Sequence, residues 1–186
     1  MAVDIQRRRF TVEEYHRLGV AGIFTEDDRV ELIDGEIIQM TPIGSPHAAC
    51  VDRLTRLFVL AAGQRASVRV QSPISLGSHS ESQPDLTLLR PRADFYASAH
   101  PGPADIWLIV EVADTSLRFD RTVKIPLYAR AAIPEVWLVD LAGACVELYR
   151  RPSAGRYEDV QRATRGEHLT CQAFPDVSAG VDEILG

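Results

Sequence analysis

The stretch SLRFDRTVKIPLYAR, residues 116–130, contains Lys124, the only lysine among the twenty Lys and Arg residues of this 186-residue chain. Arginine would serve a surface ion pair equally well, but it cannot supply a compact ammonium group whose pKa shifts on burial. Asp120, Lys124 and Tyr128 recur every four residues, which places them on one face of a helix. The alternative is a surface salt bridge of about 0.3–0.5 kcal/mol. The single lysine favours a chemical role.

Three acidic residues accompany apolar runs. Glu111 follows five apolar residues in IWLIVEVA, Asp85 follows Pro84 and precedes LTLL, and Glu31 lies in VELI. An unpaired buried carboxylate costs several kcal/mol, so such groups must be ion-paired, bind a metal or lie at the open end of a sheet. Each acid alone could instead be an ordinary solvated or ion-paired residue, and Glu31 could face solvent on an alternating hairpin.

Two carboxylates that share a hard cation, with an ammonium nearby, are suited to phosphodiester chemistry. Mg²⁺ prefers carboxylate oxygens and keeps several waters, and Mn²⁺ accepts similar ligands. Such an ion polarises a phosphoryl oxygen and generates hydroxide, while an ammonium group stabilises charge that grows on the phosphate. We therefore expect Asp85 and Glu111 to bind the metal and Lys124 to act beside it.

The N-terminal part predicts a helix and a hairpin. In FTVEEYHRLG, residues 10–19, Thr11 is the expected N-cap, Glu14 completes a capping box and Gly19 ends the helix. RVELIDGEIIQM, residues 29–40, has two β-rich runs around Asp34-Gly35, which is typical of a tight hairpin.

A longer helix is predicted over residues 44–63, with Ser45 as N-cap, Pro46 at the first helical position and Gly63 as terminator. Helical spacing of its apolar residues indicates one packed face, formed by Val51, Leu54, Leu57, Phe58 and Ala61.

The rest of the chain predicts strands and one crossover helix. Two nearly all-apolar strands, 106–113 and 135–141, flank the helical segment, which indicates parallel strands buried on both faces. Pro126 requires that helix to begin near Thr122 or to bend. The fold class is therefore α/β (α+β), with a mixed central sheet flanked by helices. Strands are expected at residues 67–76, 84–90, 106–113, 135–141, 145–150 and 157–163, and loops at 76–85 and 96–105.

Composition limits the function classes. With 46% hydrophobic and 25% charged residues and a net charge of −6, the chain is typical of one globular domain over residues 1–186 and unlike a protein that coats nucleic acid. Its apolar runs are too short to span a membrane, and three dispersed cysteines indicate reduced packing residues in the cytoplasm. There is no P-loop, GxSxG elbow or zinc spacing.

Several motifs resemble the PD-(D/E)XK nuclease superfamily. QPDL resembles the PD element and IVEVA the (D/E)XK element. VELIDGE, EVADTSL, DRTVKIPLY and AIPEVWLVD follow in the order found in a bacterial restriction-endonuclease-like family. The lysine that the superfamily places two residues after the glutamate is absent, since Ala113 stands there. The resemblance implies that the catalytic lysine has moved to the next helix, as Lys124.

The resemblance also implies a restriction-endonuclease-like fold and roles for other residues. Asp85 and Glu111 would bind Mg²⁺ or Mn²⁺, and Glu31 would complete the acidic cluster. Supporting or DNA-contacting roles are expected for Asp120, Tyr128, His47 and Gln71, although His47 could equally be a packing residue at a helix start.

The main hypothesis is a Mg²⁺-dependent endonuclease that acts on DNA, helped by the net positive segment 118–130. One alternative is a non-catalytic nucleic-acid or protein binding module on the same fold. A second alternative is a metal-dependent hydrolase of small phosphoesters. A homodimer is also expected, because cutting two strands commonly needs two sites.

Overall fold

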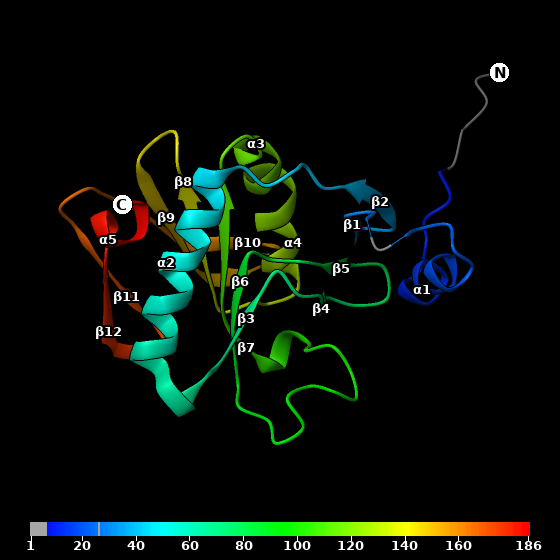
Figure 1. The fold of residues 1–186 in the computed structure, drawn as a ribbon, viewed down its shortest axis with the longest axis horizontal. Coiled ribbons are helices and arrows are strands. Elements are labelled where there is room, and N and C mark those ends of the chain that lie inside the picture. The colour runs from blue at the N-terminus through cyan, green and yellow to red at the C-terminus, as the bar shows by residue number, and fades with distance from the viewer. Residues whose placement is uncertain (1–6, 26) are drawn as a thin grey trace.

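The computed structural model describes residues 7–25 and 27–186, and a six-stranded sheet forms its centre (Figure 1). The strand order is β10-β9-β8-β7-β6-β3, and only β7 and β8 run parallel. The predicted mixed sheet and its parallel central pair are confirmed. The strands are β3 (Ser67–Val70), β6 (Leu86–Leu89), β7 (Ile106–Ala113), β8 (Glu135–Asp140), β9 (Cys145–Ser153) and β10 (Arg156–Thr164).

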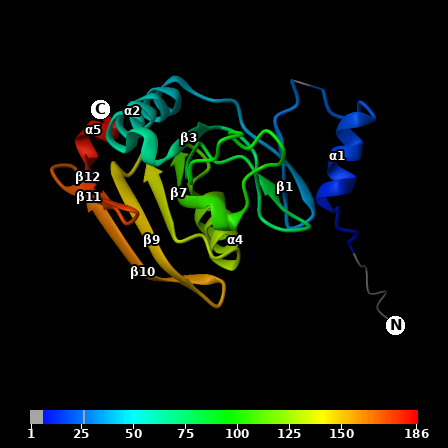
Figure 2. The same cartoon turned by 90° about the horizontal axis from the view of Figure 1, so that it is seen from below.

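Helices cover both faces of this sheet (Figure 2). Helix α2 (Ser45–Ala62) packs on one face through Val51, Leu54 and Phe58, and α4 (Ile125–Arg130) packs on the other. The N-cap of α2 is Gly44, one residue before the predicted Ser45. Ala62 is buried in place of the predicted Ala61, because the packing face continues at four-residue steps from Phe58.

The crossover from β7 to β8 contains an unusual helix. It begins with α3 (Leu117–Phe119), widens into one π-type turn, η3 (Asp120–Lys124), and continues as α4. The N–H of Ile125 donates to the carbonyl of Asp120, five residues back. This wider turn accommodates Pro126, which lacks an N–H and would clash in a regular helix. The helix therefore starts before Thr122, and the conflict at Pro126 is absorbed by the π-type turn.

The N-terminal hairpin forms as predicted. Strands β1 (Val30–Ile33) and β2 (Glu36–Gln39) are antiparallel, and Asp34 and Gly35 have φ of 48° and 78°. Positive φ at both turn residues is the requirement of a type I′ turn. A Cβ on Gly35 would also lie 2.5 Å from Cβ of Arg9, so glycine is needed there for space as well.

Helix α1 (Val12–Val20) precedes the hairpin and has the predicted Thr11–Glu14 capping box. It runs one residue past Gly19, with Ala21 as its C-cap. Helix α1 lies at the far side of the molecule from the C-terminus (Figure 1).

A short strand, β5 (Glu81–Ser82), joins the hairpin to the rest of the molecule. The sequence predicts a loop at residues 76–85, because this stretch is rich in Ser, Pro and Gly. In the structure β5 pairs with β1 and with β4 (Ile74–Ser75), giving a sheet in the order β2-β1-β5-β4. The hairpin is thereby attached beside the entry to β6.

The C-terminal region adds β11 (His168–Cys171), β12 (Phe174–Gly180) and α5 (Val181–Leu185), and short 3₁₀ turns lie at Gly63–Arg65 and Pro103–Asp105. Cys50, Cys145 and Cys171 are buried free thiols, as predicted. Within the described residues, no helix has the length and apolar character that crossing a bilayer requires.

Glu135, at the start of β8, ties β11–β12 to the central sheet. Its side chain is fully buried and accepts hydrogen bonds from Trp137 Nε1 at 2.9 Å, Arg150 Nε at 2.8 Å and the Gln172 N–H at 2.7 Å. Three donors converge on one carboxylate, so this buried charge is well compensated.

We expect Glu135→Ala to lower the free energy of unfolding by about 3–5 kcal/mol, because it leaves Arg150 without its buried counter-charge. The matched control is Asp176→Ala, which removes an exposed partner of Arg65 and should cost less than about 1 kcal/mol. Urea titrations followed by circular dichroism would measure both. Equal losses in the two variants would contradict the structural role of Glu135.

Candidate active site

Asp85 and Glu111 lie at the same end of the central sheet. Asp85 directly precedes β6, while Glu111 is near the end of β7, and the antiparallel register pairs Leu86 with Val110. The two acids therefore lie on adjacent strands at one level of the sheet. Both are nearly inaccessible, with exposed fractions of 8% and 3%.

Lys124 points from the π-type turn toward Glu111. Its Nζ lies 3.2 Å from Glu111 Oε1 and 3.3 Å from Glu31 Oε1, and the residue is 5% exposed. The hydroxyl of Tyr128, one turn further along, donates to the same Glu111 oxygen and is 2.9 Å from Ser82 Oγ. The structure thus brings Lys124, Tyr128 and Glu111 together from the predicted helix face.

Glu31 contacts the lysine and the backbone beside it. Its Oε2 accepts hydrogen bonds from Ser82 Oγ and the Gln83 N–H, both at 3.2 Å, and its Oε1 faces Lys124. Both oxygens are engaged within the protein. This arrangement suits Glu31 to hold the ammonium group in place, whereas the family resemblance implies only a place in the acidic cluster.

Asp85 is supported by donors on several sides. His47 Nε2 lies 3.1 Å from Oδ2, the Val112 N–H donates to Oδ2 at 2.9 Å, and Gln71 Nε2 donates to Oδ1 at 3.2 Å. Burial acts to raise the pKa of Asp85, but these hydrogen bonds and the charge of His47 lower it below its usual value. Asp85 is therefore held as an anion.

His47 and Gln71 have different positions in the site. His47 lines the cavity in front of the acids, whereas Gln71 contacts Asp85 without lining that cavity. Tyr128 is fully buried. Gln71 and Tyr128 can thus orient carboxylates, but they do not form part of the cavity wall.

Asp120 is buried on the same helical segment. Its Oδ2 accepts a hydrogen bond from Ser116 Oγ at 2.6 Å, and its side chain lines the cavity. Burial raises the pKa of Asp120 above its usual value, although the Ser116 hydrogen bond and the nearby charge of Lys124 oppose the rise. Asp120 adds negative charge to the site without a hydrogen bond to the lysine.

The site holds more negative than positive charge. Burial raises the pKa of Glu111 to about 8, and Asp85, Asp120 and Glu31 add to this rise while Lys124 opposes it. Burial works against the charge of Lys124, but the surrounding carboxylates raise its pKa well above the usual value. One ammonium group cannot balance four acids, so the negative charge around Lys124 is only partly compensated. The imbalance favours a further cation.

A cavity of about 440 Å³ opens in front of these groups. Glu31, Asp85, Glu111, Asp120 and Lys124 all contribute to its lining. Other residues, which no sequence pattern distinguishes, complete the walls. They come from β1–β2, the chain between β2 and α2, and the start of the crossover helix, and include Arg29, Met40, Pro42, Ile43 and Phe119.

The donor set is compatible with a magnesium-like ion that retains water ligands. Among residues 7–25 and 27–186, no group of three or more His, Cys, Asp or Glu side chains is arranged to hold a metal. Mg²⁺ commonly takes one or two carboxylates and fills its other positions with water or substrate oxygens. Asp85 and Glu111, together with the unbalanced negative charge around them, fit such a site.

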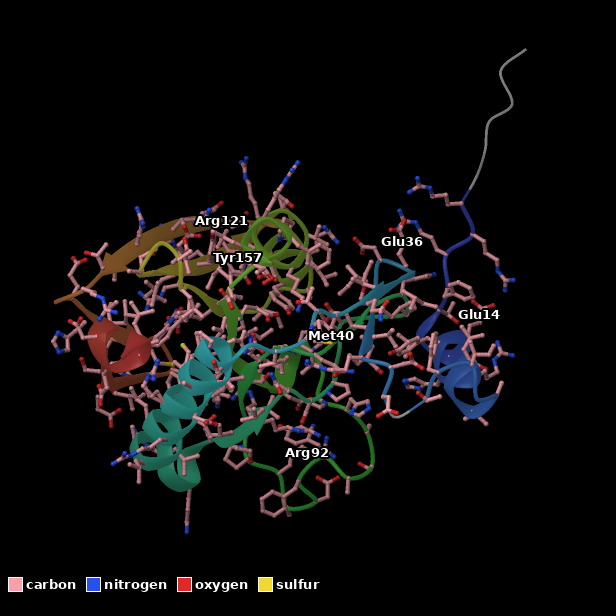
Figure 3. All side chains as sticks on the ribbon, turned by 45° about the horizontal axis from the view of Figure 1, so that its top comes forward. Glu14, Glu36, Met40, Arg92, Arg121 and Tyr157 are labelled. Atoms are coloured by element: carbon pink, nitrogen blue, oxygen red, sulfur yellow. The ribbon has the colours of Figure 1, made fainter. Side chains whose placement is uncertain are left out.

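The segment 118–130 carries less free positive charge than its sequence indicates. Arg121 pairs with Glu147 at 2.6 Å on the surface (Figure 3), Arg130 pairs with Asp34 at 2.6 Å, and Lys124 is buried. In this segment, Arg118 is exposed and has no ionic partner among the described residues. The expected basic strip along this helix is therefore mostly neutralised.

Comparisons with known proteins agree with the fold. A solved structure from Anabaena variabilis, described as a putative nuclease belonging to DUF820, is similar with a TM-score of 0.73 and 14% sequence identity, covering 95% of this chain and 97% of that one. No curated protein matches the chain. Residues 12–182 match the Uma2 family, described as "Putative restriction endonuclease". This match spans nearly all of the sequence, and the chain belongs to the Uma2 family.

Proposed function

We propose that this protein is a Mg²⁺- or Mn²⁺-dependent endonuclease that hydrolyses phosphodiester bonds of DNA. The observation that carries the proposal is the contact of Lys124 Nζ with Glu111 Oε1 at 3.2 Å, at the sheet end that also presents Asp85. Membership of a family described as "Putative restriction endonuclease" supports the same class of reaction. Three buried free thiols are compatible with the reducing cytoplasm.

Each residue would contribute a separate task. Asp85 and Glu111 would hold the divalent ion, which polarises a phosphoryl oxygen and lowers the pKa of a bound water. Lys124 would orient the attacking water and stabilise negative charge on the phosphate. Glu31 and Tyr128 would act as positioning residues, since Glu31 contacts the ammonium group and Tyr128 the Glu111 carboxylate. His47 and Gln71 would fix the orientation of Asp85.

Asp85→Asn and Glu111→Gln are expected to reduce plasmid nicking in Mn²⁺ by at least about 100-fold, because each removes a charged ligand with little change in shape. The matched control is Asp176→Asn, an exposed acid on β12 that should cut like the wild type. Circular dichroism would verify that all variants fold. Equal nicking by the wild type and both site variants would refute the proposal.

Metal binding should strengthen with pH. Because the pKa of Glu111 is raised to about 8, a proton must leave before the carboxylate can bind a cation. Below that pH the apparent Mn²⁺ affinity should rise about tenfold per pH unit, and it should level off above it. Calorimetry in two buffers of different ionisation enthalpy would count the released proton.

Glu111→Gln should abolish that pH dependence as well as weaken binding. A wild-type affinity that stays flat between pH 6 and 8 would contradict the role of Glu111. Failure to bind Mg²⁺ or Mn²⁺ at any pH would favour the non-catalytic binding module instead.

Lys124→Met is expected to lower the free energy of unfolding by about 3–5 kcal/mol, because Glu31 and Glu111 lose their buried counter-charge. Adding Glu111→Gln should restore part of this loss above the Glu111 pKa of about 8, since it then removes one of the uncompensated carboxylates. Urea titrations at about pH 9 would measure both variants. A loss below about 1 kcal/mol in Lys124→Met would mean that the lysine is not the charge that holds these acids.

A further inference from the structure

The walls of the cavity have two distinct characters. Carboxylates and Lys124 form one part, at the end of the central sheet. Met40, Pro42 and Ile43 form another, on the chain between β2 and α2, and Phe119 lies on the crossover helix (Figure 3 labels Met40). Apolar and aromatic side chains beside the reacting groups cannot stabilise the charge of a phosphate. They can pack against the flat face of a nucleobase.

The reacting groups are recessed. Glu111, Lys124 and Asp85 are each less than 9% exposed, and the cavity that reaches them has a volume of about 440 Å³. This volume lies within the range of small-molecule pockets. Bases in a duplex are stacked and paired, so an enzyme that places a base in a pocket must take it out of the stack or use a single strand.

Arg29 is a cation at the wall of the same cavity. It immediately precedes β1, is half-buried, lines the cavity and forms no ion pair with the described residues. Arg29 and His47 line the same cavity. Lys124, by contrast, is already matched by two carboxylates. Arg29 is therefore suited to bind a phosphate group of a substrate.

The charge on the outer surface is poorly suited to duplex DNA. Proteins that bind a duplex typically neutralise several phosphates on both strands with exposed Lys and Arg. Here the net charge is −6, and Arg121 and Arg130 on the helix beside the cavity are occupied by carboxylates. A single strand that enters the cavity needs fewer phosphate contacts, because stacking supplies part of the affinity.

We propose that the cavity takes an unpaired nucleotide of single-stranded DNA, with the base against Met40 and Phe119 and an adjacent phosphate on Arg29. This inference rests on the proposed nuclease function and specifies its substrate class. Arg29 and Phe119 are then specificity-determining residues that favour a single strand over a duplex.

The test is fluorescence anisotropy of a labelled 20-nucleotide DNA, as a single strand and as a perfect duplex, with Ca²⁺ present. We expect the single strand to bind at least about tenfold more tightly. Phe119→Ala should weaken single-strand binding by about 5- to 100-fold, the usual effect of losing one stacked base. Arg29→Gln should weaken it and should reduce the slope of log affinity against log salt by about 0.7, the value for one phosphate contact on a single strand.

Arg92→Gln is the matched control. Arg92 lies beyond the far end of β6 from Asp85, pairs with Asp94 and should leave binding unchanged (Figure 3). Equal or tighter binding of the duplex, or wild-type affinity in both Arg29→Gln and Phe119→Ala, would overturn the inference.

Cleavage of the same DNAs in Mn²⁺ separates this inference from the proposed function. Preferential single-strand binding without cleavage would support the substrate class and refute the hydrolysis. Cleavage of a duplex that binds as tightly as the single strand would uphold the nuclease and refute the single-strand preference.

Discussion

The arrangement of this site depends on one buried ammonium group among four carboxylates. Lys124 is removed from water, and only the attraction of Glu111 and Glu31 at 3.2 and 3.3 Å makes its charged form tolerable there. Burial raises the pKa of Glu111, and the neighbouring carboxylates Asp85, Asp120 and Glu31 add to this rise. The site is held together by opposite charges and remains short of positive charge.

This constraint requires three separate segments of the chain to meet. The hairpin brings Glu31, β7 brings Glu111, and the crossover helix brings Lys124. The type I′ turn at Asp34-Gly35 sets the register in which Glu31 faces inward, and β5 attaches the hairpin through Ser82, which bonds both Glu31 and Tyr128. A change of register in the hairpin would turn Glu31 away from the lysine, because alternate residues of a strand face opposite sides.

The central residues can be predicted from the sequence because each departs from its local context. Burying Glu111 within an apolar strand costs free energy, and Lys124 is a single lysine in a chain that otherwise uses arginine. No such pattern marks Arg29, Ser82 or Phe119, because their contacts depend on which distant segments lie beside them. The ion pair of Arg121 could not be predicted either, because its partner Glu147 lies on the distant strand β9. Local patterns likewise predicted the hairpin and capping box, but they missed β5, whose two polar residues are ordered only by their neighbours.

The position of the lysine also follows from packing. Ala113 lies two residues after Glu111 on the same face of β7, fully buried in the cluster that contains Ile125 and Tyr128. A lysine at position 113 would have to displace this apolar contact between the sheet and α4. From the π-type turn, Lys124 instead approaches Glu111 from the helix side, and Tyr128 reaches the same oxygen one turn later. The π-type turn before Pro126 thus allows the helix to place the ammonium group beside Glu111. Ala113 allows β7 to keep its apolar packing against α4.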